Sequence, residues 1–169
     1  MKNLKDYFLL DPEIIFLNHG SYGSCPEPVF TDYQKWQRNI EKQPVDFFTK
    51  QLYSYLKDSR VSMSSFIGCE EDSILFFPNP TTAVSNIIHS LKLEPSDEIL
   101  MTNHEYGALI RAWCSMSNKT GVRIVQQEIP IPLVSKEKFK NDFWSGVSDK
   151  TKVIFISHIT SPTALIFPI

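Results

Sequence analysis

The sequence predicts an α/β fold of three layers, in which helices cover both faces of a mostly parallel sheet. Two observations lead to this prediction. From residue 73 onward, short apolar runs alternate with segments whose apolar residues recur at intervals of three and four, as in strands that alternate with helices. The last apolar run, at residues 152–157, is rich in β-branched residues and typical of a strand buried in a parallel sheet.

The N-terminal part of the chain is expected to be mainly helical. An apolar run at residues 14–17 stops at residues 18–23, a loop with two glycines, which can take backbone angles that other residues avoid. Apolar side chains at spacings of three and four predict a helix over residues 28–40. A second helix is predicted from about residue 45 to 67, with Gly68 at its C-cap.

The remaining elements are predicted as alternating strands and helices. The expected strands are residues 73–77, 98–102, 122–126 and 152–157. The expected helices are residues 83–91, 104–117 and 135–147. Because no repeat, low-complexity stretch or linker divides the sequence, we expect a single unit, with an N-terminal arm and helices at residues 1–70.

Composition argues against several classes of partner. The chain has 169 residues, and 17 Lys+Arg against 19 Asp+Glu give a net charge of -2, so neither a nucleic acid nor an anionic membrane is favoured. No apolar run approaches the roughly 18 residues that span a bilayer. The three cysteines, Cys25, Cys69 and Cys114, are far apart and predict neither a zinc site nor a disulfide framework. A cytoplasmic location is therefore expected.

Three loops are candidates for chemistry because each follows a predicted strand. In open α/β sheets, ligands gather at the C-terminal ends of the strands. The loops are residues 79–82, 104–107 and 158–163.

The first loop has the residues of a phosphate cradle. Thr81, Thr82 and Ala83 would open a helix, so free backbone N–H groups and hydroxyls would face a ligand, and the helix dipole would favour an anion. The alternative is that these threonines only cap the helix. No Walker lysine follows, so the loop is not a P-loop.

The other two loops leave alternatives open. Tyr106 could stack on a planar cofactor or only pack against the protein. His104 and Glu105 could act as acid–base groups, although a lone histidine at a turn is more often a capping or solvated residue. Ser161 and Thr163 offer hydroxyls to a ligand or to a simple turn.

Five short motifs, distributed over nearly the whole chain, occur together in one order. They are LNHGSYG at 17–23 followed by the Cys25-Pro26 pair, QPVDFF at 43–48, NPTT at 79–82, HEYGA at 104–108 and HITSPT at 158–163. In this combination the chain resembles the class V aminotransferase family of fold-type-I pyridoxal 5′-phosphate (PLP) enzymes. The resemblance is strongest to the isopenicillin N epimerase-like branch.

The resemblance implies a PLP cofactor and a set of contacts for it. Thr81 and Thr82, with the backbone of Ala83, would hold the phosphate. Tyr106 matches the ring-stacking position, and Ser161 falls where the family places a polar partner for the O3′ side of the pyridine. Residues 71–169 would form part of the PLP-binding large domain.

The N-terminal loop would line the substrate pocket through Asn18, His19 and Ser21, and the substrate would be an amino acid or a derivative of one. Two positions depart from the pattern. Ala83 and Ala164 stand where relatives usually have glycine, which adds one methyl group at a tight helix start in each place, and we expect both to be tolerated.

The larger departure concerns catalysis. Family members continue past the SPT segment to an aspartate that pairs with the pyridine nitrogen, to the Schiff-base lysine and to a smaller domain, whereas this sequence ends at Ile169. We therefore assign no catalytic residue and no metal ligand. The chain is expected to be the N-terminal portion of an enzyme that acts at Cα by epimerisation, or by a lyase or transamination step.

Three hypotheses about activity follow. The chain works with a second polypeptide that carries the lysine and the aspartate, or it is a truncated inactive product, or it is a non-catalytic binding or interaction module. Its expected partners are a second copy of itself or a complementary C-terminal polypeptide.

Overall fold

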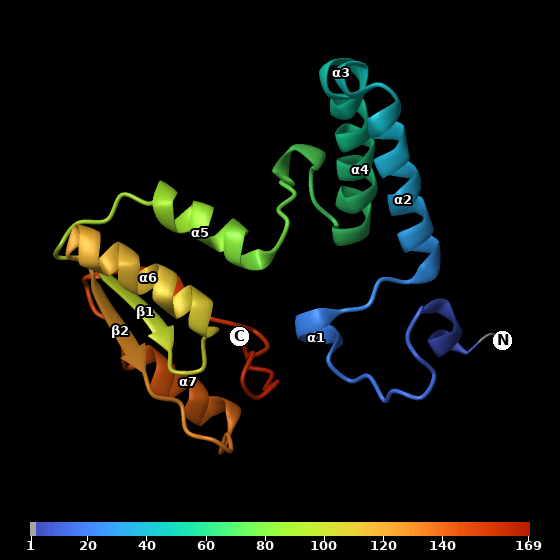
Figure 1. Ribbon diagram of the computed structural model, residues 1–169. Coiled ribbons are helices and arrows are strands. Elements are labelled where there is room, and N and C mark those ends of the chain that lie inside the picture. The colour runs from blue at the N-terminus through green and yellow to red at the C-terminus, as the bar shows by residue number, and fades with distance from the viewer. Residues whose placement is uncertain (1–2) are drawn as a thin grey trace. The chain divides into compact units, whose positions relative to one another are not determined.

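The computed structural model describes residues 3–169 (Figure 1). The chain divides into two compact units, of which the first ends at Leu75 and the second runs from Phe76 to Ile169. The first unit is helical and the second is α/β. Within residues 3–169, no helix is long and apolar enough to cross a membrane, and no group of three or more His, Cys, Asp or Glu could hold a metal ion.

The first unit contains the two predicted helices, with one difference. Its elements are η1 (Leu4–Tyr7), α1 (His19–Tyr22), α2 (Glu27–Lys42), α3 (Pro44–Asp46), η2 (Phe47–Gln51), α4 (Leu52–Ile67) and η3 (Glu71–Ser73). The predicted helix over residues 45–67 is interrupted by the π-turn η2, where the N–H of Leu52 bonds to the carbonyl of Phe47. Gly68 ends α4 in the left-handed conformation, at φ 76°, which confirms the predicted C-cap.

An aromatic cluster packs α2 against the segment that follows it. Trp36 lies with its ring centroid 4.7 Å from that of Tyr55 and 6.4 Å from that of Phe47. Phe47 is 5% exposed, and its ring also lies 6.0 Å from that of Tyr55. Because α2 itself has no fully buried residue, this cluster is the main apolar contact we identify for it.

The second unit is built on a parallel sheet of order β2-β1-β3. The strands are β1 (Glu98–Thr102), β2 (Arg123–Gln127) and β3 (Thr151–Phe155), which confirms three of the four predicted strands. All five residues of β1 are buried, because β1 is the central strand and is covered on both faces. Ile99 of β1 pairs with Ile124 and Val153 in the two neighbouring strands.

Helices cover both faces of this sheet, which confirms the three-layer prediction (Figure 1). The helices are α5 (Pro80–Ser90), α6 (Gly107–Thr120) and α7 (Lys136–Trp144). On one face, Ile99 and Met101 pack with Ile88, Trp113 and Val122 around α5 and α6. On the other, Leu100 packs with Ile129, Phe139, Phe143 and Phe167 around α7.

The predicted strand at residues 73–77 is wrong. Ser73 ends the short helix η3, and no strand within the described chain pairs with residues 74–77. Leu75 is 79% exposed. The apolar and aromatic residues of this segment favour a strand locally, but a strand forms only where a partner accepts its backbone hydrogen bonds.

Candidate functional site

The phosphate-cradle candidate lies at the N-terminus of α5. Asn79 is the N-cap, and its Oδ1 accepts a hydrogen bond from the Thr82 N–H at 2.8 Å and one from the Thr82 hydroxyl at 3.0 Å. The N–H of Ala83 bonds to the Asn79 carbonyl at 3.2 Å. Asn79, rather than a threonine, therefore performs the capping that was the alternative role for Thr81 and Thr82.

Thr81 is the residue of this turn that stays available. Pro80 occupies the first helical position and has no N–H to offer. Within residues 3–169, neither the amide nor the hydroxyl of Thr81 has a hydrogen-bond partner, and its side chain is half-buried. Two free donors at the positive end of an 11-residue helix fit an anionic group such as a phosphate.

The stacking candidate, Tyr106, has a fixed backbone and a free ring. Tyr106 is the N-cap residue of α6, and its carbonyl accepts hydrogen bonds from the amides of Leu109 at 2.9 Å and Ile110 at 3.0 Å. Its side chain is 47% exposed, and no other ring of the described chain packs on it. An aromatic face that the protein leaves uncovered fits a planar ligand.

Glu105 is not the accessible acid–base group that the sequence suggested as one option. The side chain is 3% exposed, and its carboxylate accepts three hydrogen bonds. These come from the Thr102 hydroxyl at 2.7 Å, the Ser157 amide at 3.2 Å and the Ser157 hydroxyl at 2.6 Å. Glu105 therefore joins the end of β1 to the end of β3.

His104 is also structural, and the expectation of a capping or solvated residue is wrong. The side chain is 9% exposed, and its Nε2 lies 2.6 Å from the carbonyl oxygen of Ile129. Because a carbonyl only accepts, Nε2 carries the proton. The ring also contacts Phe167 edge-on at 5.9 Å.

The third loop folds as a tight turn after β3. The Thr160 hydroxyl contacts that of Thr163 at 2.7 Å and accepts the amide of Leu165 at 3.0 Å. Thr163 therefore serves the turn. Ser161 is exposed, and its hydroxyl has no hydrogen-bond partner within residues 3–169, so it is free to contact a ligand.

The two alanines in expected glycine positions have different environments. Ala83 lies inside α5, as expected. Ala164 lies in the turn and not at a helix start, with φ 54°, and its amide bonds to the Thr160 carbonyl at 2.8 Å. A positive φ is unfavourable for alanine and readily adopted by glycine.

The predicted substrate residues belong to the first unit. Asn18 is the N-cap of α1, and its Oδ1 accepts the Ser21 amide at 3.4 Å. His19 packs its ring against Phe8 at 5.5 Å and, edge-on, against Phe16 at 4.7 Å. His19 and both phenylalanines line a largely apolar hollow of about 340 Å³.

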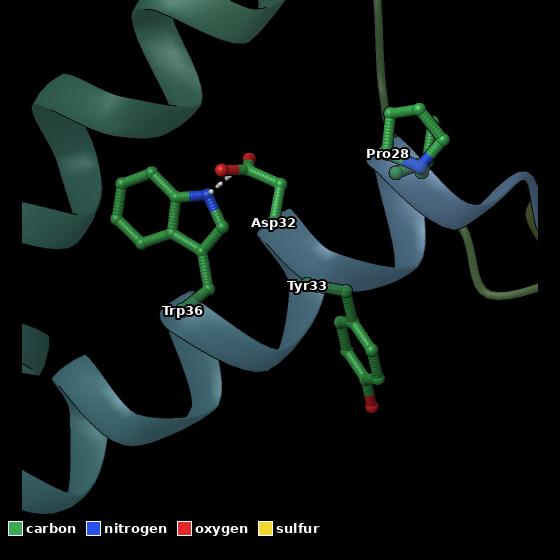
Figure 2. Close-up of a pocket in the computed structure, with 5 residues that line it drawn as sticks. Pro28, Asp32, Tyr33 and Trp36 are labelled. Atoms are coloured by element: carbon green, nitrogen blue, oxygen red, sulfur yellow. Dashed lines mark hydrogen bonds between the residues drawn. The ribbon is translucent and has the colours of Figure 1, made fainter.

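A second hollow in this unit contains none of the predicted site residues. It has a volume of about 440 Å³ and lies along α2, where Pro28, Val29, Asp32, Tyr33 and Trp36 line it (Figure 2). Figure 2 shows the Trp36 indole donating a hydrogen bond to the Asp32 carboxylate, at 3.2 Å. The hollow is shallow and its only charged group is already engaged, so it has no clear chemistry.

A family model, aminotransferase class-V, matches residues 23–169. The chain belongs to this family. Similar proteins include isopenicillin N epimerase from Amycolatopsis lactamdurans, which is 28% identical over 169 residues that cover 98% of this chain and 42% of the relative. A probable chloroplastic L-cysteine desulfhydrase from Arabidopsis thaliana is 23% identical over 173 residues, which cover 94% of this chain and 36% of the relative. The chain thus spans less than half the length of these relatives.

Solved structures of similar fold confirm the architecture. A mutant of C-DES with glycine covalently linked to its PLP cofactor has a TM-score of 0.84 and 17% identity, covering 99% of this chain and 44% of that protein. The apo cysteine desulfurase from Thermococcus onnurineus NA1 has a TM-score of 0.71 and 16% identity, covering 99% and 43%. The family and the PLP-bound neighbour support pyridoxal 5′-phosphate as the cofactor.

Proposed function

We propose that this chain provides the phosphate-binding and ring-stacking side of a PLP site in an enzyme that acts at Cα of an amino acid. The observation that carries the proposal is the pair of unused groups in the second unit. Thr81 keeps two free donors at the start of α5, and Tyr106 keeps a free aromatic face at the start of α6. An anionic phosphate on a flat pyridine ring is the kind of ligand that uses both.

Each predicted residue has a part in this proposal. The free amide and hydroxyl of Thr81 bind the phosphate, and Thr82 and Ala83 join them by exchanging their hydrogen bonds to Asn79 for bonds to the phosphate. Tyr106 covers one face of the ring, and the exposed Ser161 hydroxyl bonds to the O3′ side. Bound PLP would act as the electron sink for the carbanion at Cα.

Asn18, His19 and Ser21 contribute to substrate binding in the same proposal. All three are exposed, and His19 lies beside the apolar hollow formed by Phe8 and Phe16, which suits a substrate with an apolar portion. Relatives include both an epimerase and L-cysteine desulfhydrases, which support an amino-acid substrate. We favour an epimerase-like reaction, because isopenicillin N epimerases are among the relatives with the higher identities.

The proposal includes a second polypeptide that supplies the lysine that binds the cofactor aldehyde and the aspartate for the pyridine nitrogen. The chain matches 42% of the epimerase relative, which leaves room for such a partner. We also propose a homodimer as the assembly and the cytoplasm as the location. The alternatives are a truncated inactive chain and a non-catalytic binding module.

Cofactor binding is tested by titrating the chain with PLP and with pyridoxal, which lacks the phosphate. Thr81→Val should weaken PLP binding about tenfold, because hydrogen bonds to charged groups are worth roughly 1.5–3 kcal/mol, and should leave pyridoxal binding unchanged. Tyr106→Leu should weaken the binding of both about 3- to 10-fold, the range expected for a lost aromatic contact.

Two matched variants control this titration. Thr31→Val alters an exposed helical threonine of α2, and Tyr33→Leu alters a tyrosine that is 56% exposed. Neither should change the affinity for PLP. If PLP and pyridoxal bind equally weakly to the unaltered chain, the PLP site is contradicted and the binding-module alternative is favoured.

The second polypeptide is tested by mixing the chain with the C-terminal part of the Amycolatopsis epimerase and PLP. The expected results are a visible absorbance band of lysine-bound PLP and exchange of the Cα proton of amino acids with deuterium from the solvent. Neither component alone should produce them. If the mixture gives no band although the chain alone binds PLP, complementation is contradicted and the truncated-chain alternative is favoured.

A further inference from the structure

We propose that Glu105 is a positioning residue. It holds the loop at residues 104–107, which contains Tyr106, and the loop at residues 158–163, which follows β3, in the arrangement needed to bind the PLP ring. This inference rests on the proposed function, because it concerns the same cofactor site. Glu105 does not touch the cofactor in this proposal and acts through the two loops.

The bonding of Glu105 is unusual for a buried acid. The side chain is 3% exposed, yet no Lys, Arg or His within residues 3–169 forms an ion pair with it. Three neutral donors from Thr102 and Ser157 satisfy its carboxylate instead. Burying a carboxylate is costly, and apolar packing at such a place is often no less stable. The three hydrogen bonds offset this cost and join the end of β1 to the segment after β3 at one carboxylate.

Glu105 holds the segment after β3 through two hydrogen bonds from Ser157. One carboxylate oxygen of Glu105 accepts the Ser157 amide at 3.2 Å, and the other accepts the Ser157 hydroxyl at 2.6 Å. Ser157 lies two residues after the end of β3 and directly before the 158–163 loop. Two bonds to one residue fix the direction in which the backbone leaves the sheet.

The same carboxylate also holds the turn that precedes Tyr106, because the oxygen that accepts the Ser157 amide accepts the Thr102 hydroxyl as well. Thr102, the last residue of β1, donates its hydroxyl to Glu105 and accepts the His104 amide at 3.2 Å, which makes the turn between the strand and α6 rigid. Tyr106 follows Glu105 directly, and its carbonyl is held by the first turn of α6. The backbone of Tyr106 is thus held from both sides while its ring stays free.

A second buried glutamate provides a matched control. Glu98 is 2% exposed and lies at the other end of β1, where it accepts hydrogen bonds from Arg123 and from the Ser148 hydroxyl, the latter at 2.7 Å. Glu98 and Ser148 lie at the start of β1 and before β3, whereas Glu105 and Ser157 follow the ends of the same strands. Removal of either carboxylate should disturb the sheet, but only Glu105 lies beside the proposed cofactor loops.

The test compares Glu105→Ala, Glu105→Gln and Glu98→Ala in the whole chain, at a temperature where circular dichroism shows each to be folded. Glu105→Ala should weaken PLP binding about 3- to 10-fold, the value expected for a misplaced aromatic contact, and should remove the visible circular dichroism of bound PLP. Binding of inorganic phosphate should stay unchanged, because the α5 N-terminus does not depend on Glu105. Glu105→Gln keeps the shape and should restore most of both PLP signals, and Glu98→Ala should retain both.

Hydrogen exchange of the Ser157 amide, measured without ligand, separates this inference from the proposed function. Exchange should be faster in Glu105→Ala than in the unaltered chain and in Glu98→Ala. Unchanged exchange, or unchanged PLP affinity and dichroism in Glu105→Ala, would overturn the inference. If the unaltered chain binds no PLP while the exchange behaves as expected, the proposed function is contradicted, and only the role of Glu105 in holding the two loops is supported.

If Glu105→Ala does not fold, Ser157→Ala takes its place, with Ser148→Ala as its control. Each removes one hydroxyl that bonds to a buried glutamate. Ser157→Ala should reduce the dichroism of bound PLP, and Ser148→Ala should not. Equal effects of the two variants would overturn the inference.

Discussion

At the scale of single residues, the two alanines in expected glycine positions should respond oppositely to the same change. Ala164→Gly should stabilise the chain by about 1 kcal/mol, because Ala164 has φ 54°, where a Cβ is unfavourable. Ala83→Gly should destabilise it by about 0.5–1 kcal/mol, since Ala83 lies inside α5. Urea unfolding measures both. Destabilisation by both variants would contradict the strain assigned to Ala164.

Glu98 should make stability depend on acidity. Hydrogen bonds from the Arg123 guanidinium, and then from the Ser148 hydroxyl, lower the pKa of Glu98 below its ordinary value of 4.5. A lowered pKa in the folded state adds stability that is fully present above pH 4.5 and is lost as the pH falls through the folded-state pKa. Urea midpoints of Glu98→Gln and the unaltered chain should therefore differ at pH ~7 and converge in acid. A difference that does not vary with pH would contradict this.

At the scale of elements, the cap of α5 should separate helix stability from phosphate binding. Asn79→Ala removes the acceptor of the Thr82 amide and should cost about 1 kcal/mol. Asn79→Asp keeps an acceptor and should leave stability within about 0.5 kcal/mol, but its negative charge should weaken PLP binding. Thermal unfolding and PLP titration measure the two effects. Equal PLP affinity in Asn79→Asp and the unaltered chain would place the phosphate elsewhere.

The elements that the sequence predicted correctly are those whose signal is local. Periodic apolar residues and Gly68 located α2, α4 and its end, and apolar runs located β1, β2 and β3. Residues 73–77 have an equally apolar pattern but no pairing strand in the described chain, and pairing is not a local property. The structural role of Glu105 is likewise not a local property, because its carboxylate bonds to Ser157, which lies 52 residues further along the chain.

Only some features of the candidate site could be predicted from the sequence, because contacts between distant residues leave no local pattern. The helix start at Thr81 and the turn before α6 at Tyr106 could be located from spacing, whereas their roles came from the family resemblance. Asn79 followed by Pro80 is a local N-cap signal, whereas no local pattern shows that the carbonyl of Ile129 engages His104, because the two residues are 25 positions apart. Such contacts follow from tertiary packing.

At the scale of the whole molecule, the predicted site residues are divided between two units, with the cofactor residues after Phe76 and the substrate residues before Leu75. In the sheet of the second unit, β3 lies at an edge. Within residues 3–169, β3 pairs on one side only, so its other edge presents free backbone groups. Ile154, the fourth residue of this strand, is 43% exposed. An unprotected apolar edge strand promotes pairing with other chains.

We therefore expect the isolated chain to self-associate through β3, and a charge at this edge to reduce the association. Ile154→Lys should lower the light scattering of concentrated samples while far-ultraviolet circular dichroism stays unchanged, because charged residues on edge strands oppose pairing. Ile131→Lys is the matched control, since Ile131 is 49% exposed and lies in a loop. If the two variants reduce scattering equally, general surface hydrophobicity causes the association and not the edge. A complementary polypeptide that binds PLP together with this chain should suppress the scattering of the unaltered chain only if it covers the same strand.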